Sequence, residues 1–163
     1  MLFRVALSIF VAFGLAASLA AQTKVSGTFQ CARFDPVYSI PVGDRPGHAF
    51  AISKAQCTWL KPVEIAGVAA KDFEYTAFRD ISGDRWRGRA AAVGTLASGD
   101  RYFSSSQSSG TIKEGVPQNV EGTWSYTGGT GKLKGIKGNG TIKGKAGPDG
   151  AITFEIEGEY QLP

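Results

Sequence analysis

Apolar and polar residues alternate one by one in several stretches of this chain. Near the C-terminus, Ile152, Phe154 and Ile156 occupy every second position, and Glu155 and Glu157 lie between them. The same alternation recurs around Phe73 and Tyr75 and around Trp124 and Tyr126. A period of two predicts β-strands that have one dry face and one wet face.

No stretch after residue 21 carries a helical period, and short runs of β-branched and aromatic residues are separated by Gly, Asp, Asn and Pro. We predict eight strands, near residues 24–34, 48–59, 71–80, 84–96, 100–112, 119–127, 138–145 and 151–160. Without helices to cover their apolar faces, these strands must pack against one another. The two solutions are a closed barrel and a two-sheet sandwich.

The N-terminus has the layout of a secretory signal peptide over residues 1–21. Arg4 precedes a short apolar run, and small residues follow at the positions that a signal peptidase reads. We expect cleavage after Ala20 or Ala21, which leaves one domain over residues 22–163. The apolar run is shorter than the roughly 20 residues that a bilayer requires, and no later stretch is longer. The sequence therefore predicts a secreted or periplasmic protein without a membrane span after cleavage.

The two cysteines, Cys31 and Cys57, both lie in the exported part. Because exported proteins fold in an oxidising compartment, we expect a disulfide between them, with two buried free thiols as the alternative. Two cysteines and the single histidine, His48, lack the close spacing of a metal site, so we expect no metal and no cofactor. We expect His48 to lie at the surface. Removing Arg4 lowers the net charge from +4 to +3, which is too mild to predict nucleic-acid binding.

A glycine-rich segment from residue 122 to residue 150 holds ten glycines. It matches neither the phosphate-binding loop nor the dinucleotide-binding pattern, and neither part of it opens a helix, as both motifs require. Its lysines could form a basic patch, but no aromatic residue is interleaved with them between residues 127 and 153. We favour lysines that protect strand edges and turns. We interpret Gly128, Gly129 and Gly131 as turn residues that allow a positive φ.

The stretch Gly122-Thr-Trp-Ser-Tyr-Thr-Gly-Gly-Thr-Gly-Lys-Leu-Lys-Gly-Ile-Lys-Gly-Asn-Gly-Thr141, together with Ser98-Gly-Asp-Arg-Tyr-Phe103, resembles the allene oxide cyclase-like barrels, their dirigent relatives in plants and, most closely, secreted bacterial members of this superfamily. The resemblance covers roughly residues 94–160. It implies a single eight-stranded antiparallel β-barrel. Allene oxide cyclases isomerise a fatty-acid epoxide inside the barrel by means of an acidic residue. No catalytic carboxylate of the family can be matched here, so none is transferred, and the catalytic residues stay unknown.

The aromatic residues are the candidate ligand-binding residues. Alternation places most of them on dry faces, and we expect these to line one cavity: Phe73, Tyr75, Trp86, Phe103, Trp124, Tyr126, Phe154 and Tyr160. Arg85, Arg87 and Arg89 share one strand face, which we expect to point outward because Trp86 between them favours burial.

We therefore predict an all-β exported barrel that binds a small apolar or amphipathic molecule. Two alternatives stay open. One is an isomerase or cyclase acting on a hydrophobic substrate in the cavity. The other is a filled barrel that acts through its surface, as a dimer or trimer.

Overall fold

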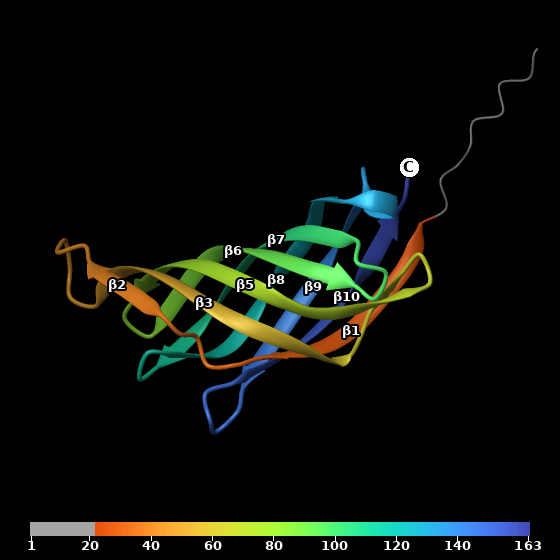
Figure 1. Ribbon diagram of the computed structural model, residues 1–163. Helices are drawn as coiled ribbons and strands as arrows, with labels where there is room; N and C mark the ends of the chain where they lie inside the picture. The colour runs from red at the N-terminus through yellow and green to blue at the C-terminus, as the bar shows by residue number, and fades with distance from the viewer. Residues whose placement is uncertain (1–21) are drawn as a thin grey trace, which may run out of the picture.

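The computed structural model describes residues 22–163, and the expected signal peptide lies outside this range. Ten strands and one short 3-10 helix follow one another along the chain (Figure 1). They are β1 (Thr23–Cys31), β2 (Val37–Pro41), β3 (His48–Lys61), β4 (Glu64–Ile65), β5 (Val68–Ser82), β6 (Arg85–Leu96), β7 (Arg101–Lys113), β8 (Val116–Gly129), η1 (Gly131–Leu133), β9 (Lys137–Ala146) and β10 (Ile152–Gln161). Within the described range, η1 is the one helical segment, and no helix there could cross a membrane.

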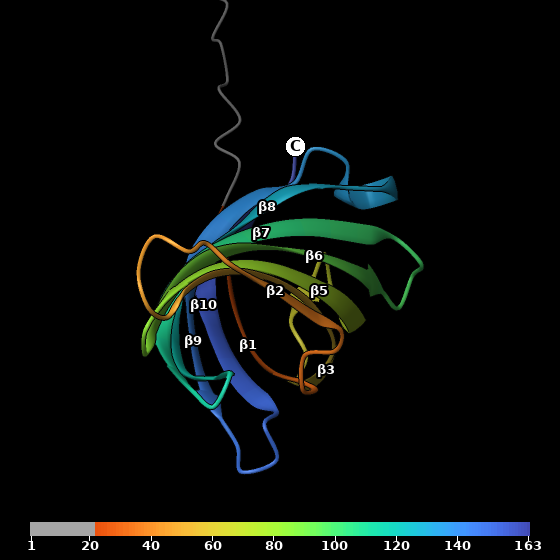
Figure 2. The ribbon, with the colours of Figure 1, turned by 90° about the vertical axis from the view of Figure 1, so that its left-hand side faces the viewer.

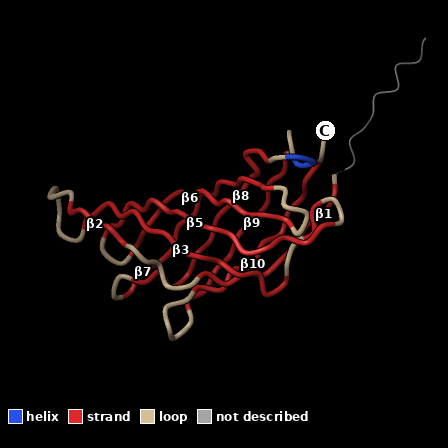
Figure 3. The backbone as a smooth tube through the Cα atoms, viewed as in Figure 1, coloured by secondary structure: helices blue, strands red, loops and turns tan. Residues whose placement is uncertain are grey.

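Eight of the strands form a closed antiparallel barrel, as predicted. The hydrogen-bonded order runs β3-β1-β10-β9-β8-β7-β6-β5, and a further pairing between β3 and β5 closes the ring. Figure 2 looks toward one end of the barrel and shows the strands curving around its axis, and Figure 3 shows how little of the chain lies outside strands. Each of the eight predicted strands corresponds to one strand of this barrel.

The other two strands, β2 and β4, were not predicted. β2 pairs with the first half of β3 on the edge that β1 occupies further along, and it has no neighbour on its other side. We call residues 37–53 the hairpin, which extends beyond one end of the barrel (Figure 1). All five residues of β2 are exposed, so the strand lacks the dry face from which alternation is recognised.

The residues that the alternation places on the dry faces point to the inside of the barrel. Along β10, Ile152, Phe154, Ile156 and Tyr160 are buried. The disulfide between Cys31 and Cys57 is confirmed: the two residues lie directly opposite each other on β1 and β3, and both are completely buried. This bond fits an oxidising compartment.

The turn between β8 and β9 is held by the first residue of β7, Arg101, and by Asp100 before it. The backbone N–H of Arg101 donates to Thr130 Oγ1 at 2.8 Å, and the Thr130 N–H donates to the carbonyl of Arg101 at 2.8 Å. Gly131 has a φ of +54°, and a Cβ there would collide with the carboxylate of Asp100. The two segments that carry the family resemblance therefore pack against each other.

The structure gives the second glycine of this turn a different role from the one we expected. Gly128 and Gly131 have positive φ values, but Gly129 does not. A Cβ on Gly129 would lie 2.6 Å from Leu133 Cβ and 2.9 Å from the carbonyl oxygen of Arg101. Close packing, and not backbone conformation, therefore requires glycine at this position. The side chains of Leu133 and Ile136, which follow this turn, are buried and belong to the hydrophobic core.

Candidate functional site

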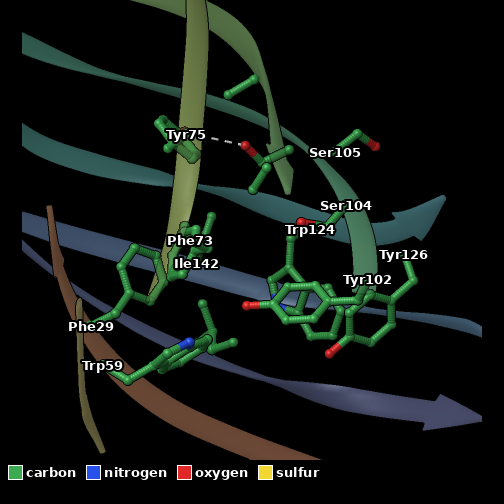
Figure 4. Close-up of a pocket in the computed structure, with 14 residues that line it drawn as sticks. Phe29, Trp59, Phe73, Tyr75, Tyr102, Ser104, Ser105, Trp124, Tyr126 and Ile142 are labelled. Atoms are coloured by element: carbon green, nitrogen blue, oxygen red, sulfur yellow. Dashed lines mark hydrogen bonds between the residues drawn. The ribbon is translucent and has the colours of Figure 1, made fainter. Parts of the chain in front are cut away.

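The barrel encloses a cavity of about 50 Å³ whose wall is mostly aromatic (Figure 4). Eight strands contribute to it, because each strand sends alternate side chains inward. Fourteen residues line the cavity: Phe29, Trp59, Phe73, Tyr75, Ala90, Ala92, Tyr102, Ser104, Ser105, Ser106, Trp124, Tyr126, Ile142 and Ile156.

Small side chains on β6 and β7 create the open space. Ala90 lies opposite Ser106 and Ala92 lies opposite Ser104 in the register of these two strands. All four residues line the cavity, so this part of the wall has no bulky side chain to fill it. Because serine is small, these residues leave the cavity open, and their hydroxyl groups form part of the cavity wall.

Ring-to-ring contacts hold the opposite wall in place. Phe29 stacks on Phe154 with centroids 4.9 Å apart, and its edge meets Trp59 at 5.2 Å and Phe73 at 4.9 Å. On the other side of the cavity, the ring of Tyr126 meets those of Trp124 and Tyr102 edge to face at 5.0 Å and 6.1 Å. Such pairs are directional and each stabilises the arrangement by about 1 kcal/mol beyond simple burial.

Three buried polar side chains of this wall have no hydrogen bond of normal geometry among residues 22–163, although the indole of Trp59 lies close enough to the Tyr102 hydroxyl to oppose the effect of burial on the pKa of Tyr102. They are Trp59 Nε1, Tyr102 Oη and Trp124 Nε1. In Figure 4, the hydroxyl of Tyr102 points across the cavity toward the indole of Trp59. Tyr75 differs, because its hydroxyl lies 3.3 Å from Ser106 Oγ. A buried polar group without a partner costs about 1–3 kcal/mol, so three in one cavity call for an explanation.

The phenols of the cavity are held in their neutral form. Burial raises the pKa of Tyr102 from 10.0 to about 12. Burial likewise raises the pKa of Tyr126 and the pKa of Tyr75, although the hydrogen bond with Ser106 opposes the shift of Tyr75. At neutral pH these side chains are therefore O–H donors, and none acts as an anionic base.

The structure distributes the predicted cavity residues over several places. Phe73, Tyr75, Trp124 and Tyr126 line the cavity. The other four do not. Phe154 lies behind the wall against Phe29, and Tyr160 accepts a hydrogen bond from the backbone N–H of Ala66 at 3.0 Å. Trp86 is buried further along the barrel and donates to the carbonyl of Thr111 at 3.2 Å.

Phe103 is the one predicted cavity residue that lies on the other face of its strand. It is only partly buried, with the guanidinium of Arg101 5.5 Å from its ring centre. Its neighbour Tyr102 faces inward instead, in register with Ser104 and Ser106. Tyr102 lies over Gly94 on β6, where any Cβ would collide with the ring.

Arg79 is a buried cation that the sequence analysis did not single out. Its side chain is 6% exposed and donates a hydrogen bond to Ser53 Oγ at 2.6 Å. The guanidinium lies 4.3 Å from the centre of the Phe34 ring and 5.4 Å from that of Trp86. No carboxylate within residues 22–163 forms an ion pair with it. Burial lowers the pKa of Arg79, and the two aromatic faces partly offset the loss of water.

His48 is buried, which corrects the expectation of a surface residue. It is 9% exposed, with Nδ1 facing the carboxylate of Asp44 and Nε2 3.2 Å from Asp80 Oδ1. The hydrogen bond with His48 is the main cause that lowers the pKa of Asp44, and the one with Arg87 is the main cause that lowers the pKa of Asp80. No pattern along the sequence marks this cluster, because the contact between His48 and Asp80 arises from the register of β3 and β5, in which His48 lies opposite Ser82, two residues from Asp80.

The arginine face of β6 lies outward, as predicted. Arg85, Arg87 and Arg89 are exposed, and Trp86 between them is buried. Arg87 donates to Asp80 Oδ2 at 3.1 Å. None of the three arginines contributes to the cavity.

No protein-family model matches this chain, and a comparison with curated proteins found no relative. The class that the geometry itself defines is a small, closed, eight-stranded antiparallel β-barrel with an aromatic cavity.

Proposed function

We propose that the barrel binds a small, mostly apolar molecule that carries a hydrogen-bond acceptor. One observation carries this proposal: Trp59, Tyr102 and Trp124 each place a donor without a well-formed hydrogen bond in the wall of one apolar cavity. Small-molecule sites combine apolar walls with a few polar groups that fix the orientation of the ligand. A carbonyl or ether oxygen would supply the missing acceptor.

The dimensions of the cavity limit the ligand. About 50 Å³ is far below the roughly 300–1,000 Å³ of a drug-sized site. The ligand is therefore a compact molecule, or one end of a longer molecule that enters the barrel and leaves the rest outside. A larger occupant would have to displace rings that hold one another in place.

Binding is favoured over catalysis by the chemistry of the lining. Among the fourteen lining residues, all within the described part of the chain, none carries a carboxylate or an imidazole. The phenols have a raised pKa and stay protonated. This arrangement donates hydrogen bonds but offers no general base for a cyclase or isomerase reaction.

We also propose that the protein belongs to the allene oxide cyclase-like superfamily and is exported to the periplasm or the extracellular medium. The closed eight-stranded barrel and the packing of Ser98–Phe103 against the glycine turn support the first proposal. The signal-like residues 1–21 and the disulfide support the second.

Binding of cyclohexanone and methylcyclohexane, compared by ligand-observed NMR, tests the proposal. These two probes have similar shapes, and only the ketone carries an acceptor. We expect the barrel to prefer cyclohexanone and to lose that preference in Tyr102→Phe, which removes one hydroxyl and keeps the ring. Tyr38→Phe, at a tyrosine outside the cavity, is the matched control.

Native mass spectrometry of protein purified from its own source extends the test to the natural ligand. A co-purified compact molecule with an acceptor oxygen would support the proposal. Failure of both probes to bind, together with the absence of any co-purified mass, would overturn it.

A further inference from the structure

The interior of the barrel holds a positive charge that has no counter-charge in the described part of the chain. The side chain of Arg79 is 6% exposed, whereas no acidic side chain within residues 22–163 is buried. His48, which is also buried, differs from Arg79 because it contacts the carboxylates of Asp44 and Asp80. A buried charge without a partner is costly, so the interior near Arg79 favours an anion.

The guanidinium of Arg79 also has hydrogen-bonding capacity that residues 22–163 do not use. Its Nη1 donates to Ser53 Oγ at 2.6 Å, but its Nε is buried and has no partner in this range. The rings of Phe34 and Trp86 cover the guanidinium at 4.3 Å and 5.4 Å from its centre. Aromatic faces offset part of the lost hydration, but they do not neutralise the charge.

The side chain of Arg79 reaches toward the aromatic cavity. Arg79 belongs to the same inward series of β5 as the cavity residue Tyr75, and Ala77 lies between them. Ser53, which accepts from Nη1, lies opposite Ala77 in the register of β3 and β5. Ala90, which lies opposite Ala77 on β6, lines the cavity. The charge therefore lies next to the part of the cavity that Tyr75 and Ala90 form.

The charge of Arg79 acts on a side chain of the cavity wall. Burial raises the pKa of Tyr75, and the hydrogen bond with Ser106 and the positive charge of Arg79 both oppose this shift. The hydroxyl of Tyr75 lies 3.3 Å from Ser106 Oγ (Figure 4). A cation that favours negative charge on this hydroxyl also favours an anion bound beside it, because Coulomb interactions are weakly screened in a water-poor interior.

We propose that the occupant of the cavity is an anion, a compact carboxylate with a small apolar group, and that Arg79 selects it by charge. This inference rests on the binding function proposed above and adds the charge of the ligand. The carboxylate would accept hydrogen bonds from donors of the cavity wall, and Arg79 would supply the counter-charge at longer range. Charge-assisted hydrogen bonds are about twice as strong as neutral ones, so the same donors hold a carboxylate more tightly than a ketone.

The number of charges favours a carboxylate over a phosphate. One guanidinium balances one negative charge, which is the charge of a carboxylate at neutral pH. A phosphate monoester carries about two negative charges, and the second would remain uncompensated among the apolar rings of the wall. The mostly aromatic lining requires the rest of the ligand to be apolar.

Two probes of equal size separate the effect of charge from that of shape. Pivalate and pinacolone share a tert-butyl group and a carbonyl acceptor, and they differ only in an O⁻ that replaces a methyl group. Ligand-observed NMR at neutral pH measures their binding to the purified protein. We expect pivalate to bind about tenfold more tightly than pinacolone.

Three arginine variants test whether Arg79 causes this preference. Arg79→Met removes the charge and keeps an unbranched side chain, so it should bind the two probes equally. Arg79→Lys keeps the charge and should retain most of the preference. Arg89→Met is the matched control, because Arg89 is exposed on β6 and its loss changes the net charge equally; it should bind as the unchanged protein does. Circular dichroism would verify folding, and Arg79→Gln would replace Arg79→Met if the latter did not fold.

The outcomes distinguish this inference from the proposed function. Pinacolone that binds as tightly as pivalate to the unchanged protein would overturn the inference and leave the proposed function in place. If neither probe binds, both proposals fail. A preference for pivalate that persists in the uncharged Arg79 variant would show that Arg79 has only a structural role, and a preference lost in Arg89→Met would assign it to the net charge of the surface; either result would overturn the inference.

Discussion

The cavity and the hairpin are built from similar side chains, yet they leave opposite kinds of group without a partner. Around the cavity, the apolar surface is buried, whereas the donors of Trp59, Tyr102 and Trp124 lack a well-formed hydrogen bond. In the hairpin, the polar side chain of His48 has two partners, whereas Tyr38 and Ile40 are about two-thirds exposed. The cavity therefore requires an acceptor atom from its ligand, whereas the hairpin keeps its apolar side chains in contact with water.

The contrast also concerns strand pairing. Every barrel strand is paired along both of its edges, but β2 is paired along only one. A complete ring has no free backbone groups, so an occupant of its interior must be small and must be recognised by side chains. A free edge is recognised by another backbone and can accept a macromolecule.

The largest effect should come from removing a ring behind the cavity wall. Phe154→Ala deletes a side chain that is 2% exposed and stacked on Phe29, and it should lower the free energy of unfolding by about 3–5 kcal/mol. Ile40→Ala removes a side chain that is 70% exposed and should change this free energy by no more than about 0.5 kcal/mol in dilute, monomeric protein. Urea denaturation measures both. Equal losses would show that the hairpin is packed like the interior, and the comparison would fail.

A smaller effect is expected at the turn that closes the cavity side of the barrel. Gly129→Val places a branched side chain where even a Cβ would lie 2.6 Å from Leu133, and it should cost about 1–3 kcal/mol. Lys132→Ala alters an exposed residue of the same turn and should be nearly neutral. Thermal melts of the two variants decide the matter. Identical melting temperatures would mean that the turn tolerates a side chain and does not constrain the barrel.

The third effect is a dependence on alkaline pH. Burial raises the pKa of Tyr102 from 10.0 to about 12, so the folded protein keeps a proton that the unfolded chain loses. The resulting stabilisation is complete below pH 10 and is lost as the pH rises toward 12, at about 1.4 kcal/mol per pH unit for one such group. Denaturation curves between these two pH values measure the slope.

Two tyrosine-to-phenylalanine variants show which tyrosine causes this dependence of the free energy of unfolding on pH. Tyr102→Phe should reduce it by the share of one tyrosine, whereas Tyr38→Phe in the exposed part of the hairpin should leave it unchanged. Tyr75 and Tyr126, whose pKa values are also raised by burial, account for the slope that remains. An unaltered slope in Tyr102→Phe would show that its hydroxyl is in contact with water.

The barrel was predictable because its strands alternate cleanly and end at Gly, Asp and Pro. β2 was not, since Val37, Tyr38 and Ile40 are exposed on both faces and give no period of two. Clear alternation is also the reason why half of the predicted cavity residues do line the cavity. Phe73, Tyr75, Trp124 and Tyr126 lie on strands with one clear dry face.

Alternation cannot assign the inward face where two aromatic or apolar residues are adjacent in the sequence. Tyr102 and Phe103 follow each other, as do Trp59 and Leu60, and the sequence does not tell which member of each pair faces inward. The pairing register of β6 and β7 decides which side chain faces inward, because it places pairs of small residues beside Tyr102. Arg79 lies in the inward series of β5, but a charged residue is expected outside unless its buried surroundings are known.

The disulfide turns the hairpin into part of a covalent ring. Cys31 and Cys57 are 26 positions apart, and the whole of β2 and most of β3 lie between them. The exposed tip at residues 42–47 is the kind of segment that proteases cleave. A single cut there would not release a fragment: the protein would keep its mass on a non-reducing gel and separate into two chains only after reduction.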